Sequence, residues 1–201
     1  MDAGRAGLWD WDDGGFLVFA EGGFVDVIME VTMKDAADVA GFFAAHAVWS
    51  ICEGETLIPI YAFVDADGQR RMERMAHQQL EHGVHAGKQR LEEPEEGVMV
   101  KVLIFDGRIP WEGGKLDALI VEWRDGSEPV GRAVVAIPYT PAAKKGFFRK
   151  AVPFAVHKPK VIDISKHWQD SIQEIFKAFF AGVSKHEHGA KVWNDHLDES
   201  K

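Results

Sequence analysis

The chain has 201 residues, the length of one large domain, and its 46% hydrophobic and 27% charged residues exclude an intrinsically disordered protein. Its formal net charge of −9 argues against a general nucleic-acid-binding protein, because binding to a phosphate backbone requires surplus Lys and Arg.

Membrane insertion and disulfide stabilisation are also disfavoured by the sequence. No apolar run approaches the ~20 residues that span a bilayer, and residues 1–13 lack the basic and apolar regions of a secretory signal. We therefore expect a cytoplasmic protein. The single cysteine, Cys52, leaves no partner for an internal disulfide and excludes a zinc site built from several thiolates. It follows an apolar stretch and is predicted to be a small buried residue.

The charge is distributed unevenly along the chain. Residues 1–128 carry 25 acids and 11 bases, whereas residues 129–162 carry seven bases and no acid. A basic segment on an acidic protein attracts anions, the acidic face of a partner, or its own acidic surface.

Turn signals predict a sheet rich in hairpins. Asp-Gly and Gly-Gly dipeptides, which favour tight turns, separate apolar runs throughout the chain. The strands predicted between them cover residues 16–20, 24–33, 56–64, 69–75, 98–105, 116–123 and 130–137. The run 98–105 is apolar at nearly every position and is expected to be a central strand covered on both faces.

Three segments have helical periodicity. Thr32 and Asp35 form a capping-box pattern that opens a helix to about Ile51. Residues 76–92 form a second segment, interrupted by two glycines, and residues 165–183 carry a continuous apolar stripe. These elements predict the α+β class: a mostly antiparallel, hairpin-rich twisted sheet of about six or seven strands, with two or three helices packed on one face. We expect a single domain over residues 1–183, followed by a polar segment, 184–201, that is a loose tail or a short docking helix.

The sequence contains no phosphate-binding glycine motif that follows a strand and no nucleophile elbow. A metal hypothesis rests on His77, Glu81 and His85, which share one stripe if the segment is helical. Two imidazoles and a carboxylate suit a divalent metal, although the stripe is long enough that only adjacent members can ligate together. An exposed polar helix face is the more common interpretation of such a pattern.

Other titratable residues have structural and chemical interpretations. His46 lies on the apolar stripe of the first helix, where a histidine commonly makes one structural hydrogen bond. Asp106 and Glu112 flank a predicted loop, where two carboxylates suit acid–base chemistry but more often are solvated turn residues.

The basic, phenylalanine-bearing segment 144–160 is the feature least explained by folding alone. Aromatic rings interleaved with cations can stack on bases, surround a phosphate or contact an anionic surface. In the alternative, the phenylalanines fill the core while the charges face water. The candidate ligand-binding residues, with a tryptophan expected in a nearby loop, are Lys144, Lys145, Phe147, Phe148, Arg149, Lys150 and Trp111.

Two functions of different classes follow from these features. The first is a binding or interaction protein without chemistry of its own, which recognises an anionic small molecule or protein through segment 144–160 and needs no cofactor. Because acidic and basic patches can pair symmetrically, this interpretation favours a homodimer. The second is a metal-assisted or acid–base hydrolase built on the histidine stripe, with a divalent metal as cofactor. A structural or immunity-type module recognised only by its partner fits the composition equally well.

Overall fold

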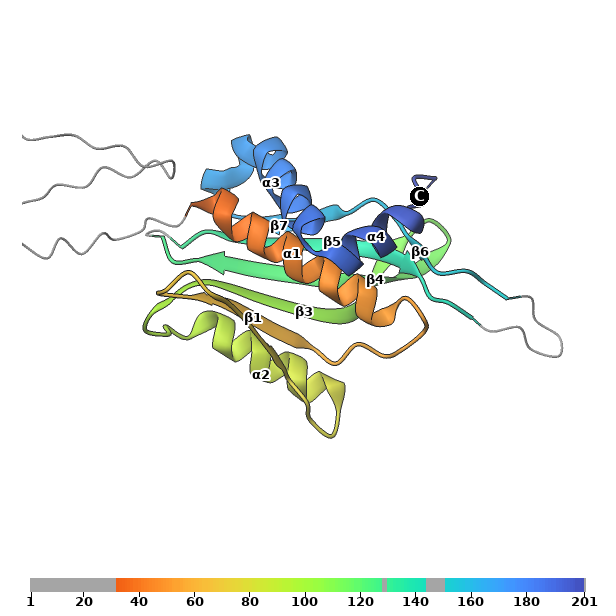
Figure 1. Cartoon of the computed structure of the whole chain (residues 1–201), viewed down its shortest axis with the longest axis horizontal. Helices are drawn as coiled ribbons and strands as arrows, with labels where there is room; N and C mark the ends of the chain where they lie inside the picture. Colours follow the sequence, from red (N-terminus) through yellow and green to blue (C-terminus); the bar gives the residue numbers. More distant parts are fainter. Residues whose placement is uncertain (1–31, 128–129, 144–150, 201) are drawn as a thin grey trace, which may run out of the picture.

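The computed structural model describes residues 32–127, 130–143 and 151–200 (Figure 1). Within these ranges the chain forms a seven-stranded antiparallel sheet whose main strand order is β2-β1-β3-β4-β5-β6, with β7 also paired to β5. The strands are β1 (Ile60–Asp65), β2 (Arg70–Arg74), β3 (Val98–Trp111), β4 (Gly114–Asp125), β5 (Arg132–Thr140), β6 (Ala155–Val156) and β7 (Lys160–Ile164). The predicted α+β class with an antiparallel sheet is confirmed.

Glycine forms the tight turns of two hairpins. Gly68 (φ +73°) lies in the turn between β1 and β2, and Gly113 (φ +82°) joins β3 to β4. The turn expected at residues 106–107 is wrong, because β3 continues through it to Trp111. Gly107 pairs with Ala118 inside the ladder, so this Asp-Gly pair lies within a long strand instead of ending a short one.

Three helices cover one face of the sheet (Figure 1). They are α1 (Met33–Ile51), α3 (Ile172–Lys185) and α4 (Glu187–Asp195), with the short 3₁₀ helix η1 (Lys166–Ser171) leading into α3. The predicted capping box opens α1: the Thr32 hydroxyl accepts from the Asp35 backbone N–H, and the Asp35 carboxylate accepts from the Thr32 backbone N–H. The main core lies between these helices and the sheet and includes Trp123, which stacks on Phe179.

The helix α2 (Leu80–Glu92) lies on the opposite face of the sheet (Figure 1). The expectation that all helices share one face therefore does not hold for α2. It closes a second, smaller core of Tyr61, Leu91 and Leu103. Gly87 makes this contact possible, because a Cβ atom there would lie 2.4 Å from a methyl carbon of Leu103. The glycine that interrupts the helical pattern is thus the contact point with the sheet.

The structure describes the C-terminal end of the chain but not the N-terminal hairpin predicted from the sequence. The hairpin expected at residues 16–33 falls in residues 1–31, outside the described residues, except that Thr32 and Met33 begin α1. In segment 184–201, helix α4 packs on α1 and buries Trp193. Among the described residues no helix has both the length and the apolarity required to cross a membrane.

Candidate ligand-binding site

Three cations form a row across the central strands of the sheet. In the β3–β4 ladder Lys101 is paired with Arg124, and in the β4–β5 ladder Arg124 is paired with Arg132. Paired residues on neighbouring strands project from the same face. Lys101 is two positions from Leu103 of the smaller core and so shares its face, which places the row on the face that carries α2.

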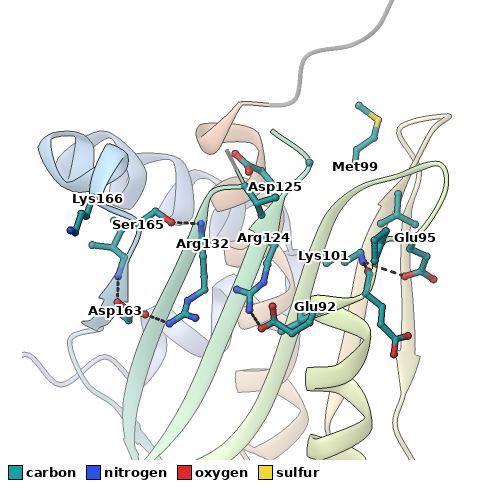
Figure 2. Close-up of a pocket in the computed structure, with 17 residues that line it drawn as sticks. Glu92, Glu95, Met99, Lys101, Arg124, Asp125, Arg132, Asp163, Ser165 and Lys166 are labelled. Atoms are coloured by element: carbon teal, nitrogen blue, oxygen red, sulfur yellow. Dashed lines mark hydrogen bonds and ion pairs between the residues drawn. The ribbon is translucent and has the colours of Figure 1, made fainter. Parts of the chain in front are cut away.

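This row lies in an open pocket of about 710 Å³ (Figure 2). Figure 2 shows Glu92 and Glu95 on the side of α2, Ser165 and Lys166 on the opposite side, and the two arginines between them. The helix α2 covers the part of the sheet beside β1 and β3, and its C-terminal end forms one wall. The β7–η1 connection forms the other wall.

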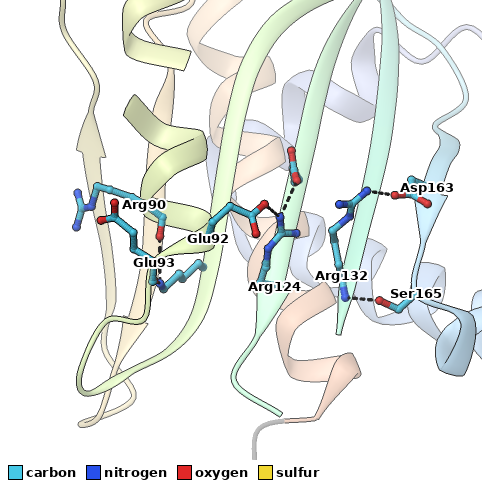
Figure 3. Close-up of polar contacts among 9 residues, drawn as sticks. Arg90, Glu92, Glu93, Arg124, Arg132, Asp163 and Ser165 are labelled. Carbon is cyan, nitrogen blue, oxygen red and sulfur yellow. Dashed lines mark hydrogen bonds and ion pairs between the residues drawn. The ribbon is translucent and has the colours of Figure 1, made fainter. Parts of the chain in front are cut away.

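Arg124 is the most deeply buried cation of the pocket, with 7% of its surface exposed. Its Nη2 donates to the carboxylates of Glu92 and Glu122 (Figure 3). Its Nη1 is buried and has no hydrogen-bond partner among the described residues. Because buried polar groups are almost always hydrogen-bonded, this nitrogen lacks the acceptor that a buried donor normally has.

Arg132 is more accessible than Arg124, with 44% of its side chain exposed. Its guanidinium pairs with Asp163 of β7 (Figure 3). Its backbone N–H donates to the Ser165 hydroxyl at 2.9 Å, and its carbonyl accepts from the Ser165 N–H at 2.8 Å. These bonds fix the wall of the pocket to β5.

Lys101 has a structural role within the row. Its ammonium donates to the backbone carbonyls of Arg90, at 3.0 Å, and Glu93, both at the end of α2. The last carbonyls of a helix lack intrahelical partners and favour a cation. Burial lowers the pKa of Lys101. We therefore assign Lys101 to the support of α2, which leaves the two arginines as the candidate binding cations of the row.

The carboxylates of the pocket differ in how firmly they are held. Glu95 accepts from Arg90 and from the Tyr61 hydroxyl, and Asp125 accepts from the backbone N–H of Gly131. Glu92, by contrast, has a side chain that is 68% exposed. Among the described residues, its carboxylate pairs with Arg124 alone. The Glu92 carboxylate is therefore the group that an incoming carboxylate or phosphate can replace.

The predicted metal residues lie on and before α2. His77 precedes the helix, which begins at Leu80, whereas Glu81 and His85 lie on it, and all three are exposed. In the described ranges no group of three or more His, Cys, Asp or Glu side chains is arranged to hold a metal ion. The metal hypothesis stays a prediction.

Part of the basic segment 144–160 lies outside the described residues. Residues 144–150, which contain Lys144, Lys145, Phe147, Phe148, Arg149 and Lys150, lie outside the described residues. Farther along, Phe154 is buried in the main core and packs beside Tyr139. Trp111, expected in a loop, ends β3, and the Lys160 ammonium lies 3.4 Å from the centre of its ring.

The remaining titratable residues are dispersed. His46 contacts His186, a residue of the expected tail. Asp106 lies within β3 and accepts a hydrogen bond of 2.9 Å from the Tyr139 hydroxyl, whereas Glu112 lies in the β3–β4 turn. Asp106 and Glu112 therefore do not flank the common loop that the sequence predicts, because one lies inside a strand and the other in the turn after it.

The arginine pair was not predicted from the sequence. The available signal was a charged residue, Lys101, inside an otherwise apolar central strand, because charged residues are rarely buried without a specific role. Comparisons of the chain with family models, curated proteins and solved structures give no match.

Proposed function

We propose that this protein is a binding protein for a small anionic ligand that carries a phosphate or carboxylate group. Arg124 and Arg132 hold the anionic group on the floor of the pocket. The observation that carries the proposal is the buried Nη1 of Arg124, an unused donor beside a second guanidinium on the neighbouring strand.

The energetics of the row support a binding role. Cations directly opposite one another in a sheet are destabilising, and burial of a charge is unfavourable unless it is fully paired. The pairing of Arg124 with Arg132 incurs the first penalty, and the burial of Arg124 incurs the second. Local features that oppose folding are concentrated at functional sites. Each guanidinium group also offers a planar fork of N–H donors, a geometry that suits carboxylate and phosphate oxygens.

Isothermal titration calorimetry with inorganic phosphate, pyrophosphate and citrate tests the proposal. We expect Arg132→Gln to weaken binding about tenfold, the effect of one lost charge-assisted hydrogen bond. Glu92→Gln is expected to strengthen binding, because it removes the carboxylate that competes for Arg124.

The matched control is Arg108→Gln. Arg108 also lies on the sheet in an ion pair, with Asp117 at 3.0 Å, but outside the pocket. This variant is expected to bind like the wild type. The proposal is wrong if none of the three anions binds to the wild type or to Glu92→Gln, or if Arg132→Gln and Arg108→Gln have equal affinities.

A further variant distinguishes anion binding in the pocket from binding at the basic segment 144–160, through which the sequence predicts that a ligand or a protein partner binds. Loss of binding in this variant, with unchanged binding in Arg132→Gln, places recognition on the segment and rejects the pocket. The variant replaces four cations with glutamine: Lys144, Lys145, Arg149 and Lys150.

A cytoplasmic location and a homodimer also belong to the proposal. The monomer has a mass of 22.4 kDa, so light scattering from the purified protein distinguishes it from a dimer. A measured mass equal to that of the monomer at micromolar concentration contradicts the dimer.

A further inference from the structure

Two histidines far apart in the sequence meet where α4 packs on α1. His46 lies on α1, and His186 lies in the turn that ends α3 and begins α4. The Nδ1 of His46 is 3.1 Å from the Nε2 of His186. The rings of Phe42 and Trp49 pack against His186, so aromatic side chains flank the contact.

The hydrogen bonds assign one proton to each ring. The Nδ1 of His186 accepts from the backbone N–H of Gly189 at 3.0 Å and so caps α4. A nitrogen that accepts carries no proton, which puts the proton of a neutral His186 ring on Nε2. That Nε2–H donates to the Nδ1 of His46, whose own proton is therefore on the buried Nε2.

A second proton on either ring breaks this chain. On His186 it must enter at Nδ1, where it faces the Gly189 N–H and removes the cap of α4. On His46 it must enter at Nδ1, where it faces the His186 N–H. Neither imidazole can become charged while both hydrogen bonds remain.

The charged neighbours also oppose a second proton. Arg74 of β2 acts on His46, and His188 of α4 acts on His186, while Arg70 of β2 lies over the Phe42 ring. The carboxylate of Asp38 is already shared by Arg70 and Lys185 of α3, and Glu187 is exposed. Burial lowers the pKa of both His46 and His186; His186 and Arg74 lower that of His46 further, and His188 lowers that of His186.

We infer that His46 and His186 form a proton-sensitive latch, which holds α4 against α1 when both rings are neutral and releases it when either ring is protonated. Release of α4 would uncover Trp193 and the surface of α1 beneath Gly189. The packing there is close, because a Cβ atom at position 189 would lie 2.3 Å from the Ala45 carbonyl oxygen. Acidification thus exposes an apolar surface on α1 and α3.

The sign of the pH effect follows from linkage. A histidine whose pKa is lower in the folded state adds no pH dependence above its ordinary value of 6.5, because it is neutral in both states. Below that value the released state takes up protons more readily, so docking of α4 weakens as the pH falls.

Hydrogen exchange of the full-length protein at pH 7.5 and pH 5.5, corrected for intrinsic exchange rates, tests the latch. We expect protection of the α4 amides to fall about tenfold at the lower pH, the linkage effect of one histidine that titrates only in the released state, while β3 and β4 keep their protection. In His186→Asn this pH dependence disappears, because asparagine caps a helix but does not titrate in this range. His85→Asn, a change at an exposed histidine of α2, is expected to behave like the wild type.

Equal α4 protection of the wild type at both pH values overturns the inference, as does the same pH dependence in His186→Asn and His85→Asn. If His186→Asn loses α4 already at pH 7.5, the nitrogen resonances of the wild-type histidines decide. Both rings must then be neutral at pH 7.5 with the proton on Nε2, and a charged ring or the other tautomer rejects the latch.

Discussion

Gly41 of α1 and Gly182 of α3 each face the backbone of the other helix where the two helices cross. A Cβ atom at position 41 would lie 1.8 Å from the Phe179 carbonyl oxygen, and one at position 182 would lie 1.9 Å from the Asp38 carbonyl oxygen. The pair lets the helices approach closely enough to bury Phe179 completely. The helical layer above the sheet therefore depends on two missing side chains.

The close crossing of α1 and α3 predicts that Gly41→Ala lowers the free energy of unfolding instead of raising it. In an ordinary helix this change stabilises by roughly 0.5–1 kcal/mol. Here the added methyl group meets backbone, and we expect a loss of about 1–3 kcal/mol in the free energy of unfolding. Urea denaturation measures it, with Gln173→Ala on the exposed side of α3 as control. A Gly41→Ala protein as stable as the wild type contradicts the close crossing.

The role of Lys101 predicts local loss of α2. Lys101→Met keeps most of the volume but leaves the Arg90 and Glu93 carbonyls without their shared donor. We expect the amides in the last turn of α2 to exchange faster, with a loss of about 1–3 kcal/mol in stability. Lys88→Met, an exposed change on the same helix, is the control. Unchanged exchange in Lys101→Met shows that the lysine does not support the helix.

Asp106 predicts a pH-dependent stability effect. Burial raises the pKa of Asp106 above its usual value of 3.8, so the folded state favours the protonated form. Stability from this group is present below pH 3.8 and is lost as the pH rises through the folded-state pKa. The asparagine variant Asp106→Asn keeps an acceptor for the Tyr139 hydroxyl. Its advantage over the wild type in thermal melts is therefore expected to grow from pH 4 to pH 7.

Asp195→Asn is the comparison for Asp106→Asn, because the pKa of Asp195 is shifted in the opposite direction. The hydrogen bond from Lys191 lowers the pKa of Asp195, so this carboxylate stabilises the protein above pH 3.8. Removal of its charge is expected to lower the melting temperature slightly at pH 7 and not at acid pH. Parallel pH trends in the two variants contradict the assigned cause at Asp106.

Thr140, His157 and Asp198 are arranged in the order of a hydroxyl, an imidazole and a carboxylate. Thr140 Oγ1 lies 3.0 Å from His157 Nε2, and His157 Nδ1 lies 3.6 Å from the Asp198 carboxylate. His157 has no exposed surface, and the parallel bridge of Val156 to Leu197 runs beside it. We therefore assign the trio to anchoring the C-terminal segment on the sheet.

Thr140→Val tests this anchor. Valine keeps the shape of threonine but leaves one nitrogen of the buried His157 ring unpaired, and we expect a loss of about 1–3 kcal/mol in the free energy of unfolding. Thr56→Val, at an exposed position, is expected to change stability by less than about 0.5 kcal/mol. Equal stability of the two variants contradicts the anchor.

Local patterns in the sequence predict the elements well where the cause is local. The capping box at Thr32 and the turn glycines Gly68 and Gly113 act through neighbouring backbone atoms, and each has the expected role. The packing face of α2 has a cause that is not local. Gly87 interrupts the apolar pattern of the helix, and the space left by its missing side chain is occupied by Leu103 of the sheet, which lies far from it in the sequence.

The candidate site depends on register, which the sequence does not contain. Arg124 and Arg132 are eight positions apart, and they become neighbours only because the β4–β5 hairpin pairs them. His46 and His186 meet through the packing of α4, 140 residues along the chain. In both cases the residue types are visible in the sequence, but their proximity is a property of the tertiary structure.

Anion binding in the pocket is tested by following the arginine Nε–H resonances by NMR during a titration with pyrophosphate. The binding site proposed here predicts saturable shifts for Arg124 and Arg132, with no change at Arg108, which lies outside the pocket. Unchanged resonances of Arg124 and Arg132 at pyrophosphate concentrations that shift Arg149 would contradict it and place anion recognition in the basic segment.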